Sequence, residues 1–341
     1  MEGSSGKTRI GDVARRAGVS VGTVSNVLNR PQIVAEETRQ AVHDAIQVLG
    51  FVPNASARQL REGASRAAGV LVLDIANPFF MEMARGIEDR LVVDGLTMVL
   101  SSSDADPERE RRVLGQFAQQ RLRGVLLVPS RRTVENLPIL TAQGTRVVFL
   151  DHKPRRQDFD AVVTDDAAGA RTAVEHLLGL GHEHIGFING SSALQQCRER
   201  RTGVRRAIRG TGARLVELEV EELNAAGGQE AMGRLLAAHP EITAVFCVND
   251  LVALGALRHA REHTIAVPDR LSVIGYDDVT FAGELAVPLS SVRQPTYQLG
   301  WQAADLLLTS AAPRQIVFQP ELIVRSSTGP APAVLPGARA V

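Results

Sequence analysis

Hydrophobic residues near the start of the chain recur at the spacing of one helix face. In the ranges 10–17, 21–28 and 36–49, apolar residues stand three or four positions apart. The inward positions are Ile10, Val13, Ala14 and Ala17; Val24, Val27 and Leu28; and Val42, Ala45, Ile46 and Leu49. Gly18 and Gly50 suit helix ends, Ser20 suits an N-cap, and Pro31 closes the second helix. We therefore expect three short helices around a small core.

The range 51–66 reads as a connector. Pro53 blocks a continued helix, and Asn54 can cap a short helix over residues 55–60. Gly63 and Ser65 then loosen the chain. We expect this segment to join two separate domains.

From Ala67 onward, short apolar runs alternate with amphipathic helices. The runs are 69–73, 98–101, 125–128, 147–150, 162–164, 185–188, 245–248 and 273–274. Such alternation is typical of parallel α/β units. The runs exceed what one small sheet needs, so we expect two lobes over residues 66–326. The Pro- and Ala-rich range 327–341 shows no periodicity and is expected to be a flexible tail.

The first two helices have the pattern of a helix-turn-helix, since a tight Gly-containing turn joins them. The second helix exposes small and polar residues: Val21, Gly22, Thr23, Ser25, Asn26 and Asn29. A helix that lies in the major groove needs an outer face without bulk that carries amides and hydroxyls. A helical hairpin in any small bundle would give a similar pattern, so the pattern alone leaves both interpretations open.

Charge and cysteine content add modest information. The formal net charge is zero, but Lys7–Arg61 carries +4 and the remaining segments together carry −4. A solvated surface would also explain this imbalance. Cys197 and Cys247 form no disulfide framework and suit a reducing compartment. Without a signal-peptide run or a membrane span, we expect a cytoplasmic, nucleoid-associated protein without a membrane partner.

Residues 10–29, followed by 54–60, resemble the lactose-repressor (LacI) family, and the resemblance extends from Thr8 to about Ser326. It implies that the second helix reads the major groove, chiefly through Val21, Gly22 and Asn26. It also implies that residues 55–60 form a hinge helix on operator DNA, with Leu60 wedged into the minor groove, where an apolar wedge kinks the duplex. The implied DNA contacts are Thr8, Ser20, Val21, Gly22, Thr23, Ser25, Asn26, Asn29, Asn54, Ala57 and Leu60.

The resemblance further implies how the protein assembles on DNA. One module offers too few contacts for specificity, so a homodimer on a near-palindromic operator is expected. The reading residues differ from those of the lactose repressor itself, and the operator should differ accordingly. The DNA-binding domain with its hinge helix is expected over residues 7–62.

For the second domain, the resemblance implies the fold of periplasmic sugar-binding proteins. Two doubly wound lobes would enclose a cleft at the carboxyl ends of their strands, with crossovers near Thr164, Arg293 and Gln319. Eight residues match family positions that contact the effector: Asn77, Phe79, Phe80, Asp151, Arg200, Asn249, Asp277 and Gln294.

This set of residue types suits a sugar. Carboxylates and amides accept hydroxyl protons, an arginine donates, and phenylalanines cover an apolar ring face. Each residue taken singly could instead be a strand-end cap or a salt bridge, and Asp250 could cap the helix that follows it. The set looks most like ribose-type members, but His152 stands where an arginine is common, which departs from ribose itself.

Other functions fit less well. His176, His182 and His184 lack the spacing and partners of a zinc site, so no metal or cofactor is expected. The glycines near Gly179 end a helix rather than open one, which argues against a dehydrogenase. Cys247 lies in an apolar strand, which argues against a thiol nucleophile. We expect no enzyme.

Two alternatives to an inducible repressor stay open. A periplasmic-type sugar-binding protein would share the second domain but have no use for residues 8–62. A member driven by a corepressor would bind DNA more tightly with its ligand. Phe79 and Phe80 favour a sugar over a purine, so we expect a repressor that a small sugar-type effector releases from its operator.

Overall fold

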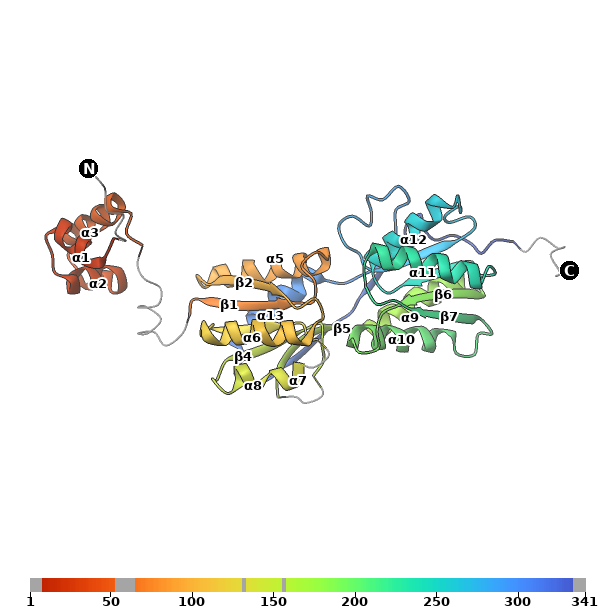
Figure 1. Ribbon diagram of the computed structural model, residues 1–341, viewed down its shortest axis with the longest axis horizontal. Coiled ribbons are helices and arrows are strands. Elements are labelled where there is room, and N and C mark those ends of the chain that lie inside the picture. The colour runs from red at the N-terminus through yellow and green to blue at the C-terminus, as the bar shows by residue number, and fades with distance from the viewer. Residues whose placement is uncertain (1–7, 53–64, 131–132, 155–157, 334–341) are drawn as a thin grey trace. The chain divides into compact units, whose positions relative to one another are not determined.

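The computed structural model describes residues 8–52, 65–130, 133–154 and 158–333. The chain divides into two compact units, Met1–Ala64 and Ser65–Val341. The described part of the first unit is helical, and the second consists of two α/β lobes (Figure 1). The expected fold class, a small all-α helix-turn-helix domain followed by a two-lobed α/β domain, is confirmed.

The first unit contains α1 (Ile10–Ala17), α2 (Val21–Asn29), a 3-10 turn (Pro31–Ile33) and α3 (Glu36–Leu49). The predicted bounds of the first and third helices are confirmed, and the second continues one residue further, to Asn29. The backbone N–H of Thr23 donates to the Ser20 side chain at 3.0 Å, so Ser20 caps α2 as predicted. The buried core is Val13, Ala14, Val24, Val27, Val42, Ala45 and Phe51.

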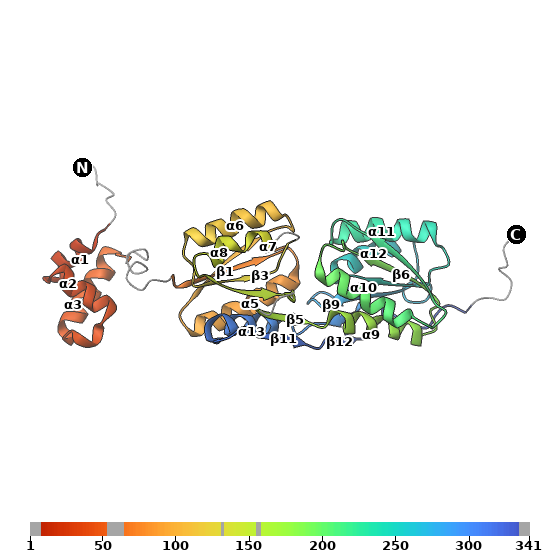
Figure 2. The same cartoon turned by 90° about the horizontal axis from the view of Figure 1, so that it is seen from below.

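In the first lobe of the second unit, six strands lie in the order β11-β5-β4-β3-β1-β2. They are β1 (Ala67–Val72), β2 (Thr97–Ser102), β3 (Gly124–Leu127), β4 (Arg146–Leu150), β5 (Asp160–Thr164) and β11 (Gln315–Phe318). The helices are α5 (Pro78–Val93), α6 (Pro107–Gln119), α7 (Thr133–Asn136), α8 (Pro138–Thr141) and α13 (Thr296–Thr309). Figure 2 shows α5 and α13 on one face of this sheet and α6, α7 and α8 on the other.

The second lobe repeats this plan with the order β12-β10-β9-β8-β6-β7. Its strands are β6 (His184–Asn189), β7 (Arg214–Glu219), β8 (Ala244–Cys247), β9 (Ser272–Asp277), β10 (Ser290–Arg293) and β12 (Glu321–Ile323). Its helices are α9 (Asp166–Gly179), α10 (Gln195–Ile208), α11 (Ala225–Ala238) and α12 (Asp250–Glu262). The paired strands of both sheets run parallel, except that β12 runs antiparallel to β10.

The chain passes between the lobes three times. It crosses after β5, which ends at Thr164, after β10, which ends at Arg293, and between β11 and β12, around Gln319. All three predicted crossovers are confirmed, and neither lobe is one continuous stretch of chain.

The strands β7, β11 and β12 were not expected, and each lies at an edge of its sheet. Central strands of parallel sheets are buried on both faces and read as apolar runs, whereas edge strands are partly exposed and mix polar with apolar residues. The sequence of β7, Arg214–Glu219, is such a mixture, and its residues are exposed or half-buried. The hydrophobic pattern therefore missed three of the four edge strands, and identified only β2 at an edge, through the run 98–101.

The predicted start of the flexible tail at residue 327 is wrong. Ser327 is fully buried, accepts a hydrogen bond from the Ser290 N–H at 2.8 Å and donates to the Val273 carbonyl at 2.6 Å. The Gly329 N–H also donates to the Ser272 hydroxyl at 3.0 Å. These contacts hold residues 327–329 against the second sheet. The predicted hinge helix over residues 55–60 lies outside the described residues.

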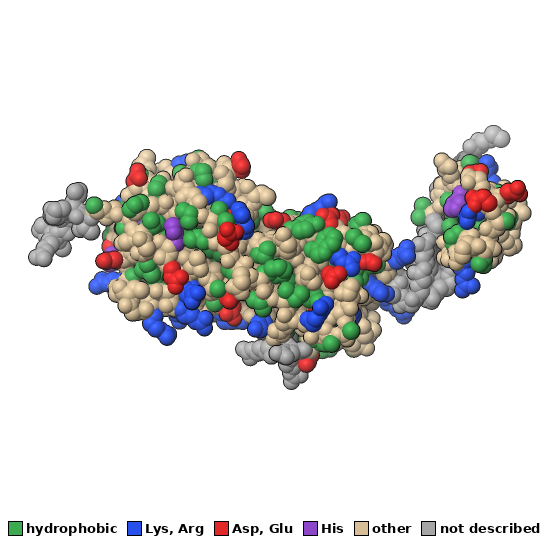
Figure 3. Space-filling model, turned by 180° about the vertical axis from the view of Figure 1, so that it is seen from behind, with side chains coloured by type: hydrophobic (Ala, Val, Ile, Leu, Met, Phe, Trp, Pro, Cys, Tyr) green, Lys and Arg blue, Asp and Glu red, His purple; other side chains and the backbone are tan. Residues whose placement is uncertain are grey.

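The surface carries charges of both signs. On the face seen in Figure 3, blue and red side chains are interspersed among apolar ones over both lobes. Within the described ranges, no helix is long and apolar enough to cross a membrane.

Candidate ligand cleft and DNA-binding helix

The outer face of helix α2 carries no bulky side chain. Val24 and Val27 are buried in the core of the first unit, while Val21, Gly22 and Asn26 are exposed. A Cβ atom built on Gly22 would meet only the Ser20 Oγ, at 3.5 Å, which is ordinary contact. The packing of the domain does not require glycine there, and the absence of a side chain leaves the backbone open to close approach from outside.

Several of the other expected DNA contacts also serve the domain itself. The Ser20 hydroxyl is engaged with Thr23, and the Asn29 Nδ2 donates to the Ser25 carbonyl at 2.6 Å. The Thr8 hydroxyl donates to the Leu49 carbonyl at 3.2 Å, which ties the start of the domain to the end of α3. The candidates Asn54, Ala57 and Leu60 lie outside the described residues.

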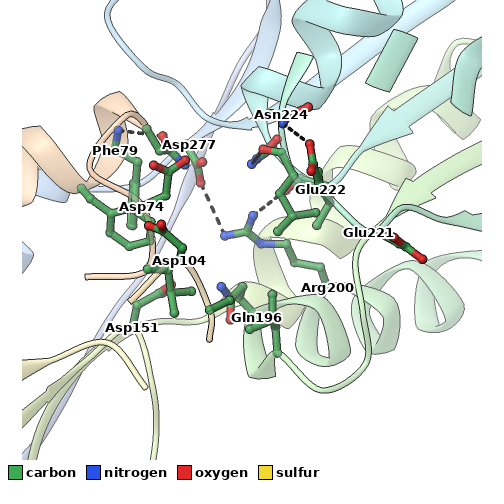
Figure 4. A pocket seen from close by; sticks show the side chains of 18 residues that line it. Asp74, Phe79, Asp104, Asp151, Gln196, Arg200, Glu221, Glu222, Asn224 and Asp277 are labelled. Carbon is green, nitrogen blue, oxygen red and sulfur yellow. Dashed lines mark hydrogen bonds and ion pairs between the residues drawn. The ribbon is translucent and has the colours of Figure 1, made fainter. Parts of the chain in front are cut away.

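A cavity of about 410 Å³ opens between the two lobes of the second unit, where the strands of both sheets end (Figure 4). Seven of the eight expected effector contacts line it: Asn77, Phe79, Phe80, Asp151, Arg200, Asn249 and Asp277. Other lining residues are Leu73, Asp74, Asp104, Ala105, Leu194, Gln196, Glu221, Glu222, Leu223, Asn224 and Val248. The carboxyl ends of parallel strands are where ligands of doubly wound sheets bind.

An aromatic wall on the first lobe is set by a helix cap. The Asn77 side chain accepts the Phe79 N–H at 3.0 Å, and Pro78 occupies the first turn of α5. Phe79 and Phe80 follow as an edge-to-face pair with ring centroids 5.2 Å apart, both buried. The local fold thus places two apolar rings beside an amide.

On the second lobe, Asn249 rather than Asp250 caps α12. Its Oδ1 accepts the Val252 N–H at 2.8 Å, and its Nδ2 donates to the Leu223 carbonyl at 3.2 Å. Asp250 accepts hydrogen bonds from the Val279 N–H and the Ser291 hydroxyl instead. The suggestion that Asp250 caps this helix is therefore wrong, and Asn249 combines a capping role with a place in the cavity lining.

Arg200 is the centre of the polar groups in the cleft. It is 3% exposed, its Nε donates to Asp166 Oδ1 at 2.8 Å, and its Nη2 lies 3.5 Å from Asp277 Oδ1. The guanidinium carbon lies 3.6 Å from the centroid of the Tyr276 ring. Burial alone would lower the pKa of Arg200, but the carboxylates of Asp166 and Asp277 raise it. The guanidinium is held charged and in one orientation.

Gln294 is the expected contact that does not line the cavity. It is 3% exposed, and its Nε2 donates to Asp277 Oδ1 at 2.9 Å. Burial raises the pKa of Asp277 to about 6, although the charge of Arg200 and the Gln294 hydrogen bond act in the opposite direction. Gln294 therefore stands behind Asp277 and positions it.

Asp151 faces the cavity from the end of β4 with a left-handed backbone, φ +50°. It is 7% exposed, and its Oδ1 has no hydrogen-bond partner in the described part of the chain. Burial and the nearby charge of Asp166 raise the pKa of Asp151 well above its usual range. Next to it, burial and Arg198 lower the pKa of His152 to about 4, so this imidazole is neutral at pH 7.

The sequence pattern missed several groups in and behind the cleft. Asp104 follows β2, at the end of a predicted strand, just as Asp151 follows β4, so its position in the sequence could have indicated it. Glu221 and Glu222 follow β7, which was not expected as a strand. Asp166 lies in the first turn of α9, behind the lining, and no pattern pointed to it.

The histidines considered for a metal site have other surroundings. His182 is 1% exposed and lies within hydrogen-bond distance of Thr243, Ser272 and the Gly329 carbonyl. Among the residues that the structure describes, no group of three or more His, Cys, Asp or Glu side chains could hold a metal ion. His182 thus fixes the end of the second sheet.

Comparison with known proteins agrees with this geometry. Residues 9–54 match the family model of bacterial regulatory proteins of the lacI family, and residues 174–328 match a periplasmic binding protein-like domain. The transcriptional repressor PurR of Mannheimia succiniciproducens is 34% identical over 93% of this chain and 98% of its own length.

Two solved structures are similar along most of their length. The lac repressor dimer bound to operator and the anti-inducer ONPF has a TM-score of 0.84 and 26% identity, over 95% of this chain and 100% of that one. A LacI-family regulator from Enterococcus faecalis with bound ribose has a TM-score of 0.71 and 31% identity, over 77% of this chain and 99% of that one. Together with the helix-turn-helix and the two-lobed cleft, these similarities show that the chain belongs to the LacI family of DNA-binding transcriptional regulators.

Proposed function

We propose that this protein represses transcription as a homodimer on a near-palindromic operator, and that a small sugar-type effector in the interlobe cleft releases it. The observation that supports this most is the cleft itself. Arg200 and Asp277 of the second lobe line it together with Asp151, Phe79 and Phe80 of the first lobe, and Figure 4 shows Arg200 across the cavity from Asp151. Polar side chains beside an apolar wall suit a ring that bears hydroxyls.

The DNA-binding part of the proposal rests on α2. Val21, Gly22 and Asn26 are exposed on one face of this helix. These residues have small side chains, so the helix can enter the major groove, and the Asn26 amide can contact base edges. Leu60 is proposed as the minor-groove wedge, in agreement with its place in the family motif. The protein would act on DNA in the cytoplasm.

Coupling between the two sites would use the three crossovers. A ligand that contacts Phe79 on one lobe and Arg200 on the other has different contacts when the angle between the lobes changes. Binding therefore favours one lobe arrangement, and through it one spacing of the paired DNA-binding units. Such coupling is typically worth about 1–3 kcal/mol and acts reciprocally on both ligands.

The test begins with selection of bound duplexes from a random DNA pool by the full-length protein. The selected duplex is then labelled, and its release is followed by fluorescence anisotropy against a panel of pentoses and hexoses. A palindrome released by one sugar supports the proposal. A palindrome bound more tightly with a ligand means corepression, and no enrichment contradicts the DNA-binding role.

Two variants make the outcome specific. Asn26→Ala should lose operator affinity but keep effector affinity, because Asn26 lies on the exposed face of α2. Arg200→Lys should keep operator affinity and lose the response to the effector, because lysine cannot reproduce the fork of the guanidinium. If both variants lose both activities, the separate roles are wrong.

A further inference from the structure

The interlobe cleft is strongly acidic. Six carboxylate side chains line it: Asp74, Asp104, Asp151, Glu221, Glu222 and Asp277. Arg200 is the one cationic side chain in the described lining. The charge of that arginine is already shared by two buried carboxylates, since it contacts both Asp166, behind the lining, and Asp277.

Nearby groups compensate little of this charge. Asp104 pairs with Arg109, an exposed contact outside the lining, and Glu222 accepts a hydrogen bond from the Asn224 Nδ2 at 2.7 Å. His152 beside Asp151 stays neutral, as described above. The Arg198 Nη1 is turned to the carbonyls of Ser192 and Ala193. The cleft thus keeps an excess of negative charge.

Asp151 differs from the other carboxyl groups of the described lining, because it has a buried oxygen without a hydrogen-bond partner, and burial among carboxylates raises its pKa. It is more than nine-tenths buried, and its Oδ1 has no hydrogen-bond partner among the described residues. Figure 4 shows Asp151 and Asp104 on one side of the cavity and Arg200 and Glu222 on the other, with open space between them. An unpaired buried carboxylate is unfavourable, and a bound group that donates a charged hydrogen bond would stabilise it.

We propose that the cleft binds a hydroxylated amine such as an amino sugar, whose protonated amino group lies against Asp151 and faces the carboxylates of the rim. The inference rests on the proposed role of this cleft as the effector site and narrows its ligand class. The hydroxyls would meet Arg200 and Asn249, and Phe79 would cover the ring. A phosphorylated sugar would add negative charge to a site that is already rich in carboxylates, and its binding is disfavoured.

The experiment is calorimetric titration of the full-length protein with matched compounds. Each neutral pentose or hexose is paired with its amino-deoxy analogue and, where one exists, its N-acetyl and phosphorylated derivatives. We expect one amino compound to bind about tenfold or more tightly than its neutral parent, because a charge-assisted hydrogen bond to a buried group exceeds a neutral one. N-acetylation, which removes the charge, should abolish the advantage.

Two variants locate the effect. Asp151→Asn keeps the shape of the side chain and removes its charge. In this variant the amino compound and its neutral parent should bind with about equal affinity. Asp269→Asn, at an exposed carboxylate ahead of β9 and so away from the carboxyl end of the sheet, should keep the full preference. The amine should also bind more tightly as the pH rises through the titration of Asp151, because the complex holds the ionised carboxylate.

The outcomes separate this inference from the proposed function. If a neutral or phosphorylated sugar binds as tightly as its amino analogue or more tightly, the amine inference is wrong. If that sugar also releases the operator, the repressor proposal still holds. Selective binding of an amine that depends on Asp151 but never releases the operator would support the inference and contradict the proposed coupling. If no compound of any class binds, the inference is wrong.

Discussion

The Nε2 of Gln294 donates a hydrogen bond of 2.9 Å to Oδ1 of Asp277, and this bond joins the ligand cleft to a crossover between the lobes. Asp277 ends β9 and lines the cavity, while Gln294 follows β10, where the chain leaves the second lobe. A ligand held by Asp277 is thus one hydrogen bond away from a segment whose conformation depends on the angle between the lobes.

Replacement of Gln294 should therefore change both the affinity for the effector and the effect of the effector on operator binding. We expect Gln294→Ala to weaken effector binding by roughly tenfold, the worth of one hydrogen bond to a charged group. Operator affinity without effector should be unchanged. Calorimetry and fluorescence anisotropy measure the two affinities, and Gln143→Ala, at an exposed position, is the control. Effector affinity equal to that of the wild type would show that Gln294 does not position Asp277.

Arg200 should matter for stability as well as for binding. Arg200→Met leaves Asp166 and Asp277 as buried carboxylates without their cation, so the free energy of unfolding should fall by about 3–5 kcal/mol. Adding Asp166→Asn should restore part of this loss without restoring effector binding. Denaturant titration followed by the fluorescence of Trp301, the single tryptophan, reports on the second unit. Equal stability of the single and double variants would contradict the role of this pair.

The stability of the second unit should depend on pH through Asp277. Its pKa in the folded protein is raised to about 6, so the folded state holds a proton that the unfolded chain loses near pH 4. Wherever the folded state binds more protons, stability falls as the pH rises. Relative to Asp277→Asn, the wild type should lose roughly 2–3 kcal/mol between pH 4 and pH 7. A difference that is constant or grows with pH would contradict the raised pKa.

Two asparagines on α2 offer a matched comparison for DNA reading. Asn26 is exposed on the outer face, whereas the amide of Asn29 is engaged with Ser25 one turn earlier. We expect Asn26→Ala to weaken operator binding by about 1–3 kcal/mol, the value of one good base contact, and Asn29→Ala to do less. Anisotropy on the selected operator measures both, and circular dichroism confirms that the helix persists. A larger loss for Asn29→Ala would place the reading residue at the end of the helix.

The sequence alone predicted the buried interior of the fold well. The strands expected at 147–150 and 245–248 could be predicted because strands buried on both faces have continuous apolar sequences. The edge strands β7, β11 and β12 were missed because half-exposed positions obey no such rule, whereas the edge strand β2 was predicted from the run 98–101. The tail was misjudged for a similar reason, since the hydroxyl of Ser327 stabilises its segment by hydrogen bonds that leave no hydrophobic pattern.

The candidate site was predictable as far as it follows strand ends. Asp151, Asn249 and Asp277 could be named because each directly follows or ends an apolar run. Asp166 could not, since it reaches Arg200 across a helix pair and is 34 residues away from it in sequence. The excess of negative charge in the cleft depends on which carboxylates the fold gathers, and the formal net charge of zero gave no hint of it.

The three crossovers also bear on how such a protein can be recombined. The first unit ends at Ala64, so one junction exchanges the complete DNA-binding part for another. Exchange of a lobe would require junctions at all three crossovers at once, because each lobe is assembled from separated stretches of chain. Recombination at this one boundary can therefore pair any operator specificity with any complete cleft, whereas the two walls of the cleft are inherited together and a new combination of them has to arise by substitutions within the second unit.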